Sequence, residues 1–163
     1  MSEQEKIEKK ILSLNEIKKK VSIWKRENKK IVFTNGCFDI IHKGHITYLA
    51  SSKDLGDKLI IGLNSDSSIS CLKGEMRPLQ DETSRAMILA SLFFVDTIVL
   101  FSEQTPYNLI KEIKPDILVK GADYKKEDIV GYDILSSYGG EVKTLKFLEG
   151  YSTTNIIKKI QGK

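Results

Sequence analysis

The sequence predicts an α/β fold in which helices cover both faces of a five-stranded parallel sheet. Three observations support this prediction. Short runs that are apolar throughout alternate with segments whose apolar residues recur every three or four positions. Strands without a polar face must be buried on both sides, which is typical of parallel sheets joined by right-handed crossovers. Polar and glycine-bearing segments follow the apolar runs, at the carboxyl ends of the strands, where such sheets bind their ligands.

The first 29 residues are predicted to form a helical extension in two pieces. Ser13 and Glu16 have the spacing of a capping box, which would open the second piece. The apolar positions of that piece share one helix face: Leu14, Ile17, Val21 and Trp24. This stripe could pack on the rest of the chain or form a dimer interface, and we expect a homodimer or a higher homo-oligomer.

Residues 30–163 are predicted to form the main domain. Its five strands are the apolar runs at residues 31–34, 58–63, 96–101, 117–120 and 142–147. Its helices are the periodic segments at residues 44–55, 83–94, 106–113, 128–138 and 152–160. Pro115 ends the third of these helices, because proline restricts the residue before it, and Gly139 ends the fourth. The expected architecture is a Rossmann-like three-layer sandwich with an N-terminal helical extension.

The length and composition indicate a soluble globular protein. A chain of 163 residues suits one domain, and 40% of its residues are hydrophobic and 29% charged. No apolar run approaches the roughly 20 residues of a membrane span, and the polar, acidic start is no secretory signal. The two cysteines, Cys37 and Cys71, form neither a disulfide framework nor a metal-ligand spacing. We therefore expect a cytoplasmic protein without a membrane partner.

The net charge of +4 comes from the N-terminal extension. Residues 1–30 hold ten lysine or arginine residues against five acidic ones, whereas the rest of the chain holds sixteen against seventeen. Nucleic-acid binding would require a basic face on the folded domain, so the charge distribution argues against a nucleic-acid partner.

Two histidines follow the first predicted strand and predict a site for an anionic group. Gly36 allows a tight turn, and the helix that begins near His42 offers free N–H groups and a positive dipole end to a phosphate. His42 and His45 share a helix face, each can donate a hydrogen bond, and Gly44 leaves room for a ligand. Two solvent-facing histidines are the alternative, and zinc would need more ligands. The chain has neither a P-loop nor a dinucleotide fingerprint, so this pair favours nucleotidyl transfer.

Further candidates follow the second strand. Asp66 could accept hydrogen bonds from ribose hydroxyls or cap the next turn. Lys73 and Arg77 lie in a predicted mobile loop at residues 72–78, which could clamp the transferring group or be an ordinary surface loop. Arg85 opens the next helix and could point to the same place or form a surface salt bridge.

The segments after the fourth and fifth strands repeat the pattern. Lys120 and Asp123 are candidate polar contacts beside Gly121, with a structural turn as the alternative. Ser152 could cap the last helix, and together with Thr153 and the helix N-terminus it could also bind phosphate.

These segments resemble a known family. The segment GCFDIIHKGH at residues 36–45 resembles the signature of the HxGH nucleotidyltransferases, the cytidylyltransferase-like superfamily, and the resemblance covers about residues 30–162. FTNGCFD (33–39), VKGADY (119–124) and EGYSTTNII (149–157) resemble the D-glycero-β-D-manno-heptose 1-phosphate adenylyltransferases. Those enzymes activate a heptose for lipopolysaccharide or other surface glycans. In many bacteria their domain is fused behind a sugar kinase, and this chain resembles the stand-alone form.

The resemblance implies ATP and a divalent cation such as Mg²⁺, with ADP-heptose as product. Cytidylyltransferases for glycerol 3-phosphate share this layout, but they usually carry an Arg-Thr pair where this chain has Phe147 and Leu148. That departure removes a phosphate-binding arginine and favours the heptose branch. Lys73, Arg77 and Lys120 are the candidate replacement cations.

The predicted reaction transfers AMP from ATP to a heptose 1-phosphate, with release of pyrophosphate. The alternatives are CTP-dependent transfer to glycerol 3-phosphate or a related alcohol phosphate, and a non-catalytic nucleotide sensor. The predicted catalytic residues are His42, His45 and Lys73. The predicted nucleotide- or phosphate-binding residues are Asn35, Gly36, Cys37, Phe38, Asn64, Asp66, Lys120, Gly121, Asp123, Ser152 and Thr153. The predicted substrate-binding residues are Asp39, Arg77 and Arg85. No protein ligand is assigned to the metal, because the nucleotide and water would supply most of its ligands.

Overall fold

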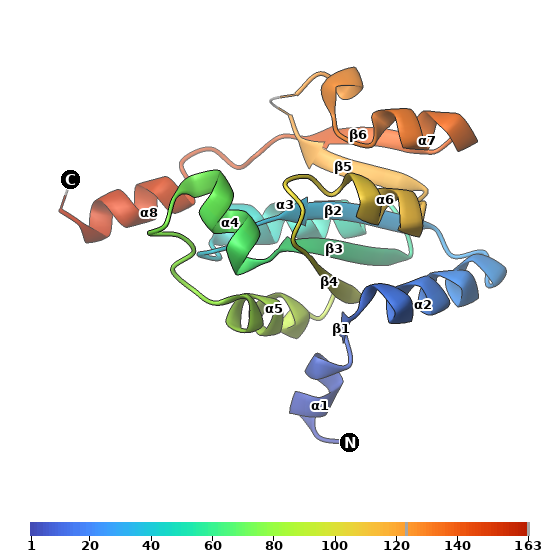
Figure 1. The fold of residues 1–163 in the computed structure, drawn as a ribbon, viewed down its shortest axis with the longest axis horizontal. Coiled ribbons are helices and arrows are strands. Elements are labelled where there is room, and N and C mark those ends of the chain that lie inside the picture. The colour runs from blue at the N-terminus through green and yellow to red at the C-terminus, as the bar shows by residue number, and fades with distance from the viewer. Residues whose placement is uncertain (123, 163) are drawn as a thin grey trace.

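The computed structural model describes residues 1–122 and 124–162. Figure 1 shows helices packed around one parallel sheet, with the last helix projecting from the body. The sheet has six strands in the order β1-β4-β3-β2-β5-β6. The prediction of an α/β fold with a parallel sheet is confirmed, but the prediction of five strands is wrong.

The strand that the prediction missed is β1 (Ile11–Leu12), which pairs with β4 through Ile11↔Ile98 and Leu12↔Val99. Two residues are too few to produce an alternating pattern, and this pair stands between two helices, where it reads as part of a helical stretch. The remaining strands are β2 (Ile31–Gly36), β3 (Lys58–Asn64), β4 (Thr97–Phe101), β5 (Ile117–Gly121) and β6 (Glu141–Leu145).

The helices lie close to their predicted positions, with two exceptions. They are α1 (Glu3–Glu8), α2 (Leu14–Arg26), α3 (Lys43–Lys53), α4 (Asp66–Lys73), α5 (Glu82–Ser91), α6 (Tyr107–Ile113), α7 (Tyr132–Tyr138) and α8 (Thr153–Ile160). Helix α4 replaces the start of the predicted loop, so Lys73 ends a helix and Gly74, with φ of 92°, follows it. The predicted helix at 128–138 is divided into a 3₁₀ turn (Lys126–Asp128) and α7, because Gly131 has φ of 96°.

The two faces of the sheet bury two separate cores. Phe33 and Ile60 face the core that α2, α6 and α7 complete. Val32 and Ile61 face the core that α3 and α5 complete. The alternation of neighbouring strand residues between these cores follows from the two-residue period of a β-strand. The predicted three-layer arrangement therefore describes the chain.

The N-terminal residues pack on this body. The capping box of Ser13 and Glu16 is present, and Ile17, Val21 and Trp24 of α2 are buried in the first core. The prediction of a domain boundary at residue 30 and the prediction of an oligomer stay predictions. Within the described part of the chain, no helix is long and apolar enough to cross a membrane.

The topology creates an opening at the centre of the sheet. From β2, the chain adds β3 and β4 on one side and later adds β5 and β6 on the other. Strand β2 pairs with β5 only at Val32↔Ile117 and Phe33↔Leu118, although it continues to Gly36. The carboxyl ends of β2 and β5 therefore part, and crevices at such reversal points are where open α/β sheets bind ligands.

Candidate active site

The loop between β2 and α3 places two imidazole rings against each other. His42 is the N-cap of α3, and its Nδ1 accepts a hydrogen bond of 3.4 Å from the backbone N–H of His45. The two rings stack with centroids 3.8 Å apart and an interplanar angle of 23°. Phe38 contacts the other side of His45 edge-on at 5.2 Å. Because Nδ1 of His42 is the acceptor, its proton is on Nε2, which leaves an N–H donor for a ligand.

Both histidines are neutral at pH 7. Burial, assisted by the neighbouring His42 and Lys73, lowers the pKa of His45 to about 4. Burial also lowers the pKa of His42. The pair therefore offers N–H donors to a bound anion rather than a fixed positive charge in the free protein.

Gly44 is required by the histidine pair itself. A Cβ at this position would lie 3.0 Å from the ring of His42 and 3.2 Å from Cβ of Tyr151. The space beside Gly44 that was predicted to hold a ligand is thus occupied by the His42 ring and by the segment that leads into α8.

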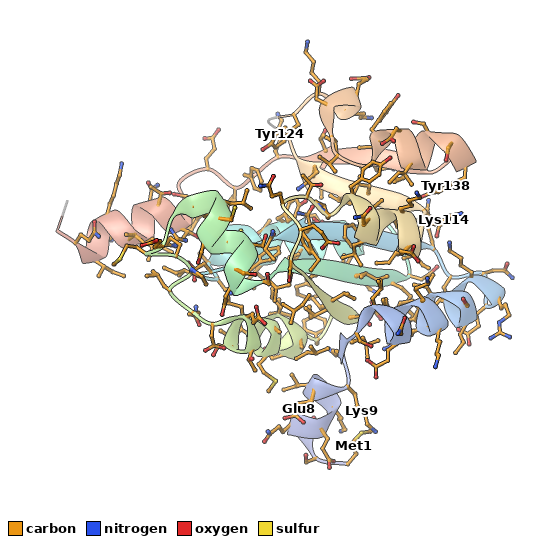
Figure 2. The ribbon with its side chains drawn as sticks, viewed as in Figure 1. Met1, Glu8, Lys9, Lys114, Tyr124 and Tyr138 are labelled. Atoms are coloured by element: carbon orange, nitrogen blue, oxygen red, sulfur yellow. The ribbon has the colours of Figure 1, made fainter. Side chains whose placement is uncertain are left out.

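A cavity of about 380 Å³ opens beside the histidine pair, between the parted ends of β2 and β5. We call it the His45 cavity. Eight of the predicted site residues line it: Asn35, Gly36, Cys37, Phe38, His45, Lys73, Lys120 and Gly121. Three further residues, which were not predicted as site residues, complete the lining: Tyr48, Tyr124 and Phe147. Tyr124 lies on the loop after β5, where Figure 2 labels it. The structure thus brings residues from four separate segments to one cavity.

Tyr48 forms part of this cavity and ties three elements together. Its hydroxyl lies 2.9 Å from Oγ1 of Thr34, which also lies 3.1 Å from the backbone carbonyl of Val119 in β5. Burial raises the pKa of Tyr48 to about 12, so it stays a neutral phenol. Its position three residues after His45, on the same face of α3, is the sequence signal that could have identified it.

The N-terminus of α8 approaches the same loop. Oγ1 of Thr153 donates a hydrogen bond of 3.4 Å to the carbonyl of Ile40, and Nζ of Lys43 lies 5.6 Å from the ring centroid of Tyr151. Ser152 caps the helix by accepting a hydrogen bond of 3.0 Å from the N–H of Asn155, as predicted. Two helix N-termini, those of α3 and α8, therefore lie side by side.

A further cavity lies along this second helix start. It has a volume of about 500 Å³ and is lined by residues 146–152, Ala122 and Asn155. We call it the α8 cavity. It shares Phe147 with the His45 cavity.

Gly121 and Phe147 fit together closely at that shared wall. A Cβ at Gly121 would lie 2.1 Å from the ring of Phe147, whose centroid is 5.5 Å from that of Tyr48. Gly121 therefore leaves space for the ring of Phe147, which stands where cytidylyltransferases for glycerol 3-phosphate are expected to carry an arginine.

Asp39 anchors the segment that follows α4. Its buried carboxylate accepts hydrogen bonds from Nε of Arg77 at 2.7 Å and from the backbone N–H groups of Leu79 and Gln80 at 2.8 and 3.0 Å. Burial alone would raise the pKa of Asp39, but these donors outweigh it and hold the pKa below its usual value. Asp39 and Arg77 thus fix the segment next to Lys73. Their predicted contact with substrate stays a prediction.

Arg85 is completely buried and joins four segments. Its guanidinium donates to the backbone carbonyls of Cys37, Asn64 and Gln80 at 2.7 to 3.0 Å, and to Oδ1 of Asp66 at 2.7 Å. Arg85 does form a salt bridge, with Asp66, but the alternative prediction that it lies at the surface is wrong. The sequence did not indicate this burial. Arginine is usually exposed, and no residue close to Arg85 in the sequence identifies it as an exception.

Asp66 and Asn64 lie at the end of β3. Ser65, and not Asp66, caps α4, and the half-exposed carboxylate of Asp66 pairs with Arg85. Asn64 is buried and donates a hydrogen bond of 2.9 Å to Oγ of Ser68.

A third cavity, of about 390 Å³, adjoins the His45 cavity but shares no described lining residue with the α8 cavity. We call it the second cavity. Asn35, Gly36, Cys37, Lys120 and Tyr124 line both cavities. Its other lining residues include Asn64, Gln104, Thr105 and Asp128, with Leu72 and Ile129. The prediction missed Gln104 and Thr105 although they follow β4, where the carboxyl-end rule applies.

Lys120 is a partly buried cation between these two cavities. Burial lowers its pKa, and its Nζ makes no hydrogen bond or salt bridge with the residues that the structure describes. Three buried polar atoms lack a partner in the described part of the chain: Asn35 Oδ1, His45 Nδ1 and Arg77 Nη2. Unpaired buried polar atoms are rare in native proteins, and two of these belong to residues that line the His45 cavity, Asn35 and His45, where a ligand could satisfy them.

The predicted Asp123 lies outside the described residues. Among the described residues, no three His, Cys, Asp or Glu side chains form a metal-binding cluster. The donors at the site are imidazole N–H groups, ammonium groups, a hydroxyl and helix N-termini, and these bind phosphate oxygens rather than a cation.

Known proteins resemble this chain over most of its length. The sequence matches the family described as cytidylyltransferase-like at residues 33–159. The bifunctional protein HldE of Wolinella succinogenes is 50% identical over 161 residues, which are 99% of this chain and 33% of that protein. The bifunctional protein HldE of Campylobacter jejuni subsp. jejuni serotype O:2 is 56% identical over 156 residues, which are 96% of this chain and 32% of that protein.

This chain therefore spans about a third of the length of these curated relatives. A solved structure, that of the lipopolysaccharide core biosynthesis protein from Thermoplasma volcanium, superposes with a TM-score of 0.60 and 32% sequence identity. The match covers 74% of this chain and 99% of that one. The resemblance read from residues 36–45 is confirmed, and the chain belongs to the cytidylyltransferase-like family of nucleotidyltransferases.

Proposed function

We propose that this chain transfers AMP from ATP to a heptose 1-phosphate, giving ADP-heptose and pyrophosphate for a lipopolysaccharide-type surface glycan. The observation that carries the proposal is the stacked pair of His42 and His45 beside a cavity that also holds Lys73 and Lys120. Family membership supports nucleotidyl transfer. The name of the Thermoplasma volcanium protein, a lipopolysaccharide core biosynthesis protein, supports a surface-glycan product.

The reaction is an in-line displacement at the α-phosphorus of ATP. An oxygen of the sugar phosphate forms a bond to that phosphorus, and the bond from the phosphorus to the β-phosphate oxygen breaks and releases pyrophosphate. The attacking oxygen is already an anion, so the step needs no general base. Catalysis then rests on positioning and on stabilisation of the negative charge.

Each part of the site has a role in that step. The N–H groups of His42 and His45 donate to the oxygens of the α-phosphate as charge develops, and Lys73 neutralises the transferring group. Ser152, Thr153 and the N-terminus of α8 bind the β- and γ-phosphates, because a helix start offers free N–H groups to an anion. A Mg²⁺ ion that enters with ATP would be held by phosphate oxygens and water and would neutralise phosphate charge.

The choice of nucleotide and acceptor is tested by one experiment. Pyrophosphate release is measured with ATP and CTP, each combined with heptose 1-phosphate or glycerol 3-phosphate. The proposal predicts that ATP with heptose 1-phosphate gives the highest kcat/KM. A preference for CTP with glycerol 3-phosphate would overturn the substrate assignment, and ATP binding without pyrophosphate release from any pair would overturn catalysis.

A further inference from the structure

Three cavities lie in a row along the carboxyl ends of the strands. The His45 cavity shares Phe147 with the α8 cavity, and it shares a wall that includes Asn35 and Lys120 with the second cavity. Among the described residues, the α8 cavity and the second cavity have no lining residue in common. The His45 cavity, which holds the transfer centre of the proposed reaction, is therefore the middle of the row.

In-line transfer assigns the two outer cavities to different substrates. The entering and leaving oxygens lie on opposite sides of the phosphorus, so the acceptor and the pyrophosphate must extend in opposite directions. The α8 cavity carries a helix start, which suits the pyrophosphate end of ATP, and the aromatic side chains of Phe147 and Tyr151, which suit its adenine ring. The acceptor is left with the second cavity on the opposite side.

The lining of the second cavity fits a hydroxyl-rich molecule. The side chains of Asp128, Thr105 and Gln104 are exposed at the mouth of the cavity; within the described residues the first two make no hydrogen bond or salt bridge, and Gln104 makes only a 3.9 Å contact with Sγ of Cys71. A carboxylate, a hydroxyl and an amide with free hydrogen-bonding capacity match the alternating donors and acceptors of a sugar ring. Leu72 and Ile129 add apolar surface for the C–H face of the ring.

Lys120 stands where the acceptor phosphate would be. It lines both the second cavity and the His45 cavity, it is partly buried, and it has no carboxylate partner in the described part of the chain. An anion offsets the cost of partly removing a cation from water, and a phosphate held at this boundary supplies one. Lys73 lies on the His45 cavity only and serves the transferring group.

We propose that the second cavity binds the sugar ring of the acceptor. Asp128, Gln104 and Thr105 recognise its hydroxyls, and Lys120 holds its phosphate at the boundary with the His45 cavity. This inference rests on the proposed function, and it assigns acceptor specificity to residues outside the histidine signature.

The test compares cavity variants with a matched neighbour. Asp128→Asn and Thr105→Val each remove hydrogen-bonding capacity with little change in size, and Glu127→Gln changes an exposed carboxylate in the same turn outside the cavity. Steady-state pyrophosphate release gives the KM for heptose 1-phosphate and for ATP. Asp128→Asn is expected to raise the KM for the sugar phosphate about tenfold or more. The KM for ATP stays within about twofold, and Glu127→Gln behaves as wild type.

A second measurement identifies the contact. A heptose 1-phosphate that lacks one hydroxyl is compared with the complete sugar on wild type and on each variant. If Asp128 binds the missing hydroxyl, the incomplete sugar should have a higher KM than the complete sugar with wild type. With Asp128→Asn the two sugars should have similar KM values, because both changes remove the same hydrogen bond. Thermal unfolding of each variant confirms that the fold is intact.

The outcomes separate this inference from the proposed function. If wild type is active with heptose 1-phosphate but the variants keep its KM, or raise the KM for ATP instead, the second cavity is not the acceptor site and the proposed function stands. If wild type releases no pyrophosphate with any sugar 1-phosphate, the proposed function is wrong and the acceptor assignment is wrong with it.

Discussion

The imidazole rings of His42 and His45 stack at 3.8 Å between centroids, and the backbone N–H of His45 donates to Nδ1 of His42. One histidine therefore caps the helix on which the other stands. The hydrogen bond fixes the tautomer of His42, and burial keeps His45 neutral. Because the two histidines are three residues apart at a helix start, the same hydrogen bond caps the helix and orients the two rings as N–H donors.

Acid should destabilise the protein through His45. The pKa of His45 is about 4 in the folded protein, against an ordinary value of 6.5, because of burial. Between these values the unfolded chain binds a proton at this residue and the folded protein does not, so the free energy of unfolding falls as the pH is lowered from about 6.5 to about 4. Urea unfolding across this range measures the slope.

The neutral variant His45→Gln isolates the contribution. It cannot take up a proton, so its free energy of unfolding should fall less steeply over the same pH range than that of wild type. Equal slopes for the two proteins would show that His45 has no depressed pKa.

Removal of the Asp39 carboxylate should loosen the segment after α4. Asp39→Ala leaves the partly buried Arg77 without its partner and two backbone N–H groups without an acceptor. The expected loss is about 3 kcal/mol in the free energy of unfolding, since breaking a buried pair leaves an uncompensated charge. Chemical denaturation measures it. In the double variant with Arg77→Ala the loss should be smaller than the sum of the single losses, and simple additivity would contradict a direct pairing.

A methyl group at Gly121 should displace Phe147. The added Cβ would overlap the ring at 2.1 Å, and overpacking of this kind typically costs about 1–3 kcal/mol. Gly121→Ala is expected to raise the KM for ATP, because Phe147 lines the wall between the His45 and α8 cavities. The matched test is Gly121→Ala with Phe147→Ala. In the Phe147→Ala background, Gly121→Ala should lower the free energy of unfolding less than it does in wild type. An equal loss in both backgrounds would mean that the ring of Phe147 is not what the added methyl group overlaps.

Arg85 should tolerate neither alanine nor lysine. Arg85→Ala leaves three backbone carbonyls without their donor, at an expected cost of about 3 kcal/mol or more in unfolding free energy. Lysine keeps the charge but cannot reproduce the planar fork of donors. Asp66→Asn is the comparison, and it should cost less than Arg85→Ala, because it keeps an oxygen acceptor for the buried Arg85 and removes only the charge of its partner. A larger loss for Asp66→Asn than for Arg85→Lys would show that the ion pair, and not the carbonyls, matters.

The sequence predicted the fold wherever a residue pattern had room to repeat. The strands from β2 to β6 and the capping box at Ser13 were all visible in this way. Strand β1 was not, because its two residues are defined by pairing with Ile98 and Val99 far along the chain. The break in the helix before α7 depends on Gly131 adopting a positive φ, which packing selects.

The site was predictable where chemistry follows directly from residue type and position. His45, Lys73 and Ser152 lie in the segments that follow strands, and the structure places them on the linings of two neighbouring cavities. Burial was not predictable, because Arg85 acquires its partners from segments separated by up to 48 residues. Gln104 was accessible to the carboxyl-end rule, but no motif drew attention to it.

The most direct test of the account is the turnover of His45→Ala. With ATP and heptose 1-phosphate at saturation, kcat for pyrophosphate release should fall by about 10²–10³, the typical cost of losing one donor to a developing negative charge. Thr47→Ala, an exposed change on the same helix, is the control and should keep wild-type turnover. A His45→Ala protein that folds normally and retains near-normal kcat would contradict the assignment of the histidine pair as the transfer centre.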